Sequence, residues 1–83
     1  MTDTEIFDDL KNIIEREFGI DKENIEEDME LDQDLNITDL EIDDFVALLE
    51  EKYDIKIPQN KIPTFFKISD VVNYLYENID STH

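Results

Sequence analysis

The sequence has no cysteine and no tryptophan, and its 83 residues include one glycine, two prolines and one histidine. Without cysteine, disulfides, thiolate metal ligands and cysteine nucleophiles are all excluded. The single histidine is His83, and no serine or cysteine is paired with it in any pattern typical of nucleophilic catalysis. A glycine-rich phosphate loop is also missing. We therefore expect a protein that is not an enzyme.

Basic residues are scarce too. Seven Lys and Arg face 24 Asp and Glu, which gives a formal net charge of -17. Such a field repels nucleic acid and anionic membranes and attracts basic protein surfaces, although acidity can also serve solubility alone. No apolar run approaches the roughly 20 residues that span a bilayer, and the acidic start MTDTEIFDDL lacks the form of a secretory signal. We expect a soluble cytoplasmic protein that binds neither nucleic acid nor membranes.

Apolar side chains recur at helical spacing in three stretches, which predicts an all-α fold. The stretches are residues 4–18, 39–53 and about 69–79. A short helical turn is expected at 59–62, where Pro63 limits it. The whole chain is then a single domain, 1–83, folded as a monomeric bundle of three long helices and one short helix, with 80–83 frayed. The core candidates are Phe7, Leu10, Ile14, Phe45, Leu49, Val72 and Leu75.

The ends of these helices carry recognisable signals. Asp3 or Thr4 is expected to cap the first helix, and Gly19 stands where a helix commonly ends in the left-handed conformation. Thr38 or Asp39 is expected to cap the second. Residues 20–38 fit no single period and predict a long first loop, pinned by apolar side chains. Those side chains are Ile20, Ile25, Met29, Leu31, Leu35 and Ile37.

Residues 34–58, DLNITDLEIDDFVALLEEKYDIKIP, resemble the central segment of the acyl carrier protein family. Asp34 and Leu35 match its opening, Leu40 matches the leucine that follows its attachment serine, and 50–58 match its ending. Residues 67–75 resemble the start of the family's last helix. The resemblance implies a four-helix carrier domain that serves fatty-acid, lipid or polyketide-type synthesis, with acyl-transfer or synthase-type enzymes as partners.

The departure from the family falls at Asp39. The family's Asp-Ser-Leu reads Thr38-Asp39-Leu40 here, and the resemblance implies that this serine would carry the phosphopantetheine arm. A carboxylate cannot form the stable phosphodiester, and the Thr38 hydroxyl lies one residue early, so we expect no phosphopantetheine. Asp39 would instead cap the helix, and its charge could imitate a phosphoserine. The change is either a natural loss or a designed block of modification.

The acidic outer face of the second helix is the expected docking surface for basic partners, with a solvated helix face as the alternative. Two functions stay open: a carrier, and a non-carrying interaction or regulatory module with the same fold. The residues that match the family's docking positions are Leu40, Glu41, Asp44, Ala47, Glu50 and Glu51.

One further spacing resembles the ligand offsets of a calcium-binding loop. Ile37 stands where that loop needs glycine, and Asp43 stands where it needs a longer Glu. We therefore expect no specific metal site. The residues with this spacing are Asp32, Asp34, Asn36, Thr38 and Asp43.

Overall fold

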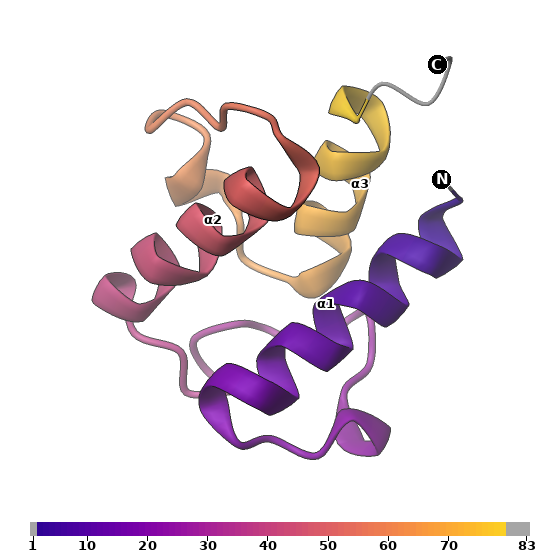
Figure 1. Cartoon of the computed structure of the whole chain (residues 1–83). Coiled ribbons are helices and arrows are strands. Elements are labelled where there is room, and N and C mark those ends of the chain that lie inside the picture. The colour runs from indigo at the N-terminus through magenta and orange to yellow at the C-terminus, as the bar shows by residue number, and fades with distance from the viewer. Residues whose placement is uncertain (1, 80–83) are drawn as a thin grey trace.

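The computed structural model describes residues 2–79, and this part of the chain folds into three α-helices and two 3₁₀ helices (Figure 1). The all-helical prediction is confirmed. Helix α1 packs along α3, and the 3₁₀ helix η2 lies against α2. The frayed tail predicted at 80–83 lies outside the described residues. The elements are α1 (Asp3–Phe18), η1 (Lys22–Asn24), α2 (Asp39–Tyr53), η2 (Ile62–Thr64) and α3 (Ile68–Asn78).

The short fourth helix differs from the prediction. Within residues 2–79 no fourth α-helix forms, and the turn predicted at 59–62 is the 3₁₀ helix η2, which starts at Ile62. Pro63 lies inside η2, in its first turn, where the missing N–H of proline costs no hydrogen bond. The segment predicted as a long loop also contains a 3₁₀ helix, η1.

The start of α1 corrects the predicted cap. Thr2 is the N-cap, and not Asp3 or Thr4: its hydroxyl accepts a hydrogen bond from the Glu5 N–H at 3.1 Å. The Glu5 carboxylate accepts in return from the Thr2 N–H at 3.0 Å, which lowers the pKa of Glu5. At the other end, Gly19 adopts φ 70° as predicted, and its N–H bonds to the Glu15 carbonyl.

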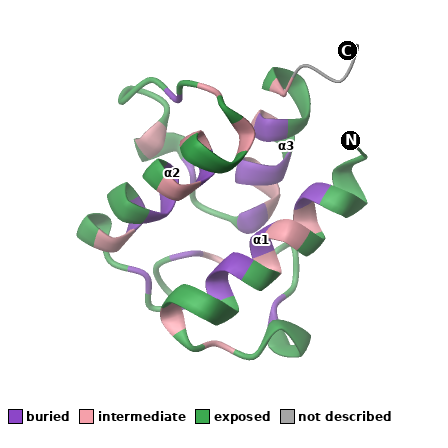
Figure 2. Ribbon diagram, in the orientation of Figure 1, coloured by how far each residue is buried: buried purple, intermediate pink, exposed green. Residues whose placement is uncertain are grey.

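The core is one continuous cluster drawn from all three α-helices and from both segments that connect them (Figure 2). Of the six side chains expected to pin the segment between α1 and α2, Ile25, Leu31, Leu35 and Ile37 are buried, and Ile20 and Met29 are partly buried against the cluster. Phe7 is only half-buried, because its ring lies at the edge of the cluster with the Lys11 ammonium 4.6 Å from the ring centre. The other predicted core residues are buried: Leu10, Ile14, Phe45, Leu49, Val72 and Leu75.

Backbone hydrogen bonds tie the first inter-helix segment to the entrance of α3. The Leu31 N–H donates to the Phe66 carbonyl at 2.8 Å, and the Ile68 N–H donates to the Met29 carbonyl at 3.1 Å. This pairing fixes residues 29–31 against 66–68 and so sets both beside the start of α2. Among residues 2–79, no helix is long and apolar enough to cross a membrane.

Candidate functional site

The start of α2 is built by a capping box. The Thr38 hydroxyl oxygen accepts from the Glu41 N–H at 3.3 Å, and the Glu41 carboxylate accepts from the Thr38 N–H at 3.2 Å. The Thr38 hydroxyl also donates to that carboxylate at 3.0 Å. Thr38 is therefore the N-cap, and the alternative prediction of Asp39 as the cap is wrong. Asp39 is the exposed first helical residue, where the helix dipole favours negative charge.

A tight turn over residues 30–37 comes directly before this cap. The Asn36 N–H donates to the Asp32 carbonyl, and the Ile37 N–H donates to the Leu31 carbonyl, both at 2.9 Å. Asn36 adopts φ 57°, a left-handed conformation that asparagine tolerates better than most residues. Because Ile37 is buried, the first turn of α2 is held against the core while its outer side faces solvent.

The predicted docking residues separate into two groups. Leu40, Asp44, Ala47 and Glu51 are all exposed and recur every three to four positions, so they form one stripe along α2, which we call the outer stripe. Leu40 is 80% exposed, a high value for a large apolar side chain. The other two predicted residues have structural partners. Glu41 completes the capping box, and the Glu50 carboxylate accepts from the Ile57 N–H at 2.8 Å.

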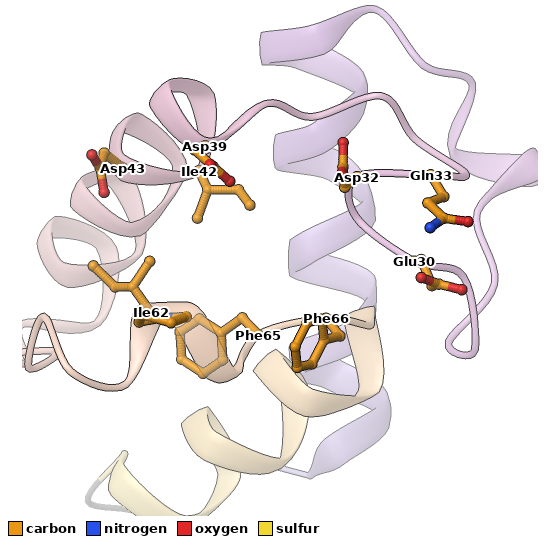
Figure 3. Close-up of a pocket in the computed structure, with 10 residues that line it drawn as sticks. Glu30, Asp32, Gln33, Asp39, Ile42, Asp43, Ile62, Phe65 and Phe66 are labelled. Atoms are coloured by element: carbon orange, nitrogen blue, oxygen red, sulfur yellow. The ribbon is translucent and has the colours of Figure 1, made fainter.

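A cavity of about 450 Å³ lies beside the start of α2 (Figure 3), and sequence reasoning missed it. We call it the Asp39 cavity. Its walls come from three segments: the first turn of α2, the turn at 30–33 and residues 62–66. Five apolar and five polar residues line it, namely Ile42, Ile62, Pro63, Phe65 and Phe66, and Glu30, Asp32, Gln33, Asp39 and Asp43.

The residues with calcium-loop spacing do not converge on one point. The Asp34 carboxylate accepts from the Glu30 N–H at 2.8 Å, and Thr38 is engaged in the capping box. Across residues 2–79, no group of three or more His, Cys, Asp or Glu side chains is placed to hold a metal ion.

Comparison with known proteins agrees with this architecture. The family model described as "Phosphopantetheine attachment site" matches residues 8–75. The chain is 35% identical over 74 residues to the acyl carrier protein of Campylobacter lari, across 89% of this chain and 95% of that protein. It is 36% identical over 75 residues to that of Borreliella burgdorferi, across 90% and 94%. The chain belongs to the acyl carrier protein family. The acyl carrier protein of Wolinella succinogenes is 32% identical over 73 residues, across 88% and 96%.

Acyl carrier proteins are carriers and not enzymes, and the family normally holds phosphopantetheine. The residues at the start of α2 do not fit covalent attachment of that group. Asp39 presents a carboxylate in place of a hydroxyl, and the Thr38 hydroxyl already bonds to the Glu41 carboxylate. At the start of α3, the Ser69 backbone N–H donates to the Glu27 carbonyl at 2.8 Å.

Proposed function

We propose that this member of the acyl carrier protein family docks basic surfaces of acyl-transfer or synthase-type enzymes through α2 and carries no phosphopantetheine. One observation supports the proposal most directly. Asp39 occupies the position that the resemblance gives to the attachment serine. Its neighbours are Thr38, whose hydroxyl is hydrogen-bonded within the capping box, and Leu40, whose side chain is exposed. The first neighbour leaves no free hydroxyl at the helix start. The second leaves an apolar anchor for a partner.

The outer stripe has the composition of a binding face. Leu40 and Ala47 supply apolar contact, and Asp44 and Glu51 flank Ala47 along the same face of α2. Interfaces commonly combine an apolar centre with a polar, charged rim. The capping box and the buried face of α2 do not require a leucine at position 40, so folding alone does not explain why an apolar residue stands at this exposed position.

The charge of α2 is also uncompensated. The two ion pairs within residues 2–79 join Lys11 to Asp8 at 3.2 Å and Arg16 to Glu17 at 3.1 Å, so both belong to α1. The single basic residue of α2, Lys52, lies 5.8 Å from the ring centre of Tyr53. An acidic surface of this kind steers basic partners and speeds their association, especially at low salt.

Membership of the family favours a second candidate, a carrier of acyl groups in fatty-acid, lipid or polyketide-type synthesis. That function needs a hydroxyl that can attack the pyrophosphate of coenzyme A. The two candidates therefore differ in one measurable property, the gain of a phosphopantetheine by the intact protein.

The deciding experiment weighs three proteins after incubation with coenzyme A and a broad-specificity phosphopantetheinyl transferase. The wild type should stay unmodified, because a carboxylate cannot attack the pyrophosphate. Asp39→Ser should gain one phosphopantetheine. Asp3→Ser is the matched control, because Asp3 also follows a capping threonine at a helix start, and it should stay unmodified. Modification of the wild type would overturn the proposal and direct attention to Thr38 or Ser69.

The same reaction tests docking, with the transferase as the basic partner. In the Asp39→Ser background, adding Asp44→Lys and Glu51→Lys should slow modification at least about tenfold at low salt, and added salt should slow the parent variant. The control pair is Glu26→Lys and Asp28→Lys, which change the net charge equally on exposed residues outside α2. Equal slowing by both pairs would show that the overall field, and not the outer stripe, guides the transferase.

A further inference from the structure

We propose that the Asp39 cavity binds a small organic cation with an apolar body, such as an alkylammonium. The site is distinct from the outer stripe, because none of Leu40, Asp44, Ala47 and Glu51 lines it. Its volume of about 450 Å³ lies within the range of about 300–1,000 Å³ typical of sites for small molecules.

The apolar body would lie on the side of the cavity formed by Ile42, Ile62 and the two phenylalanines. In Figure 3, Ile42 projects from α2 toward this space, and Phe65 and Phe66 lie along its opposite wall. Ile42 and Phe65 are buried, so these contact surfaces are fixed by the core. Phe66 is 67% exposed, and a ligand in the cavity could cover part of that ring.

The charge of the cavity selects the sign of the ligand. Four of its lining side chains are carboxylates, and none that the structure describes there is Lys, Arg or His. Within residues 2–79, the side chains of Asp32, Asp39 and Asp43 have no hydrogen-bond or ion-pair partner, unlike the carboxylate of the neighbouring Asp34. Negative potential concentrated in a concave, partly apolar site attracts cations and repels anions.

The side chains that line the cavity argue against two other kinds of ligand, a bare metal ion and an anionic amphiphile. A bare metal ion would need several converging oxygen ligands, and no cluster of three or more His, Cys, Asp or Glu is placed to hold one across residues 2–79. An anionic amphiphile would bring its charge against Glu30, Asp32 and Asp39. A cation with an apolar body uses both halves of the lining, with its charge near the carboxylates or over the exposed face of Phe66.

The test is an NMR titration of the full chain with octyltrimethylammonium, octanol and octanoate at constant ionic strength. Octyltrimethylammonium should shift the methyl signals of Ile42 and Ile62 and saturate them at a concentration about tenfold lower than octanoate. Octanoate that binds as tightly as the cation would overturn the proposal. Shifts that leave Ile42 and Ile62 unmoved would also overturn it, because binding would then lie elsewhere.

Paired variants separate the cavity from the general field. Asp32→Asn with Asp39→Asn should weaken octyltrimethylammonium binding about tenfold, whereas Asp44→Asn with Glu51→Gln, which removes the same charge outside the cavity, should weaken it less than about twofold. Equal losses would overturn the proposal.

A second pair tests the apolar wall. Phe66→Ala should weaken cation binding, and Tyr76→Ala, which removes an aromatic side chain 54% exposed and outside the cavity, should not. Equal weakening by the two variants would overturn the assignment of the wall. The outcome of this binding test is independent of the proposed function, because that function is tested by measuring the mass of the wild type and of the Asp39→Ser variant.

Discussion

Helices α1 and α2 begin in the same way but in different surroundings, because a cavity borders the start of α2. Both starts read Thr-Asp-x-Glu, and both form a complete capping box. Residues 2–5 are all exposed. At the start of α2, the box lies between the buried Ile37 and Ile42, carries the exposed Leu40 and borders a cavity.

Comparing the two helix starts shows which features of the start of α2 are explained by helix formation and which are not. The capping box accounts for Thr38 and Glu41, and the helix dipole accounts for an acidic residue at position 39, as it does at Asp3. None of these needs a ligand or a partner. Helix formation leaves two features unexplained, the apolar residue at the exposed position 40 and the Asp39 cavity, so those two features support the functional proposals.

The largest expected effect comes from removing what holds α2 in place. Phe45 is 1% exposed and meets Phe18 edge to face, with 6.2 Å between ring centres. Phe45→Ala should lower the free energy of unfolding by about 3–5 kcal/mol in urea denaturation. Phe66→Ala is the matched control, since Phe66 is largely exposed, and should cost less than about 1 kcal/mol. A loss below about 1 kcal/mol for Phe45→Ala would show that α2 is not anchored through this face.

A smaller effect concerns the far end of α2, where Tyr53 donates a hydrogen bond to the Asp9 carboxylate of α1 at 2.8 Å. Tyr53→Phe should cost about 1.5 kcal/mol at neutral pH, because the acceptor is charged and the pair is half-buried. Burial, followed by this hydrogen bond, raises the pKa of Tyr53 above its ordinary value of 10.0.

The sign of that shift sets the pH dependence. The folded state holds the phenolic proton more tightly than the unfolded state, so this stabilisation is complete below pH 10 and is lost as the pH rises toward the folded pKa. Urea melts from pH 8 upward should show a steeper alkaline loss for wild type than for Tyr53→Phe. Tyr76→Phe, at an exposed position, should follow wild type; parallel curves for all three proteins would contradict the role of Tyr53.

The smallest effects compare the two capping boxes directly. Thr38→Ala should cost about 1 kcal/mol, because loss of the cap also loosens a turn fixed to the buried Ile37 and Ile42. Thr2→Ala should cost about 0.5 kcal/mol, since the exposed first turn of α1 can fray without disturbing the core. Both values come from thermal or urea unfolding. Equal losses would mean that the two starts are energetically equivalent despite their different surroundings.

Local sequence signals were sufficient for the helices. The apolar spacing predicted α1, α2 and α3 within a few residues, and Gly19 marked the end of α1. The signal for the true cap of α1 was also available, because Glu5 stands three residues after Thr2, as a capping box requires. Asp3 and Thr4 are acceptable caps by type, but neither has Glu or Gln three residues later.

The site depended on contacts that no local pattern encodes. The Asp39 cavity brings residues 62–66 against residues 30–33 and the start of α2, which are distant from 62–66 in sequence, so its volume follows from tertiary packing. The sequence likewise could not show that Glu50 bonds to the Ile57 N–H, which removes it from the free docking charges. Leu40 was predicted at the docking face from the resemblance, and the structure shows its side chain 80% exposed.

The backbone pairing between residues 29–31 and 66–68 has a kinetic consequence. These partners are separated by more than a third of the chain, whereas the helices close through contacts within a few residues. Joining such distant segments costs a large loss of chain entropy, and the stabilising contacts form only after that loss. We therefore expect the helices to form early and this pairing to form late, so two walls of the Asp39 cavity would be among the last parts of the molecule to assemble.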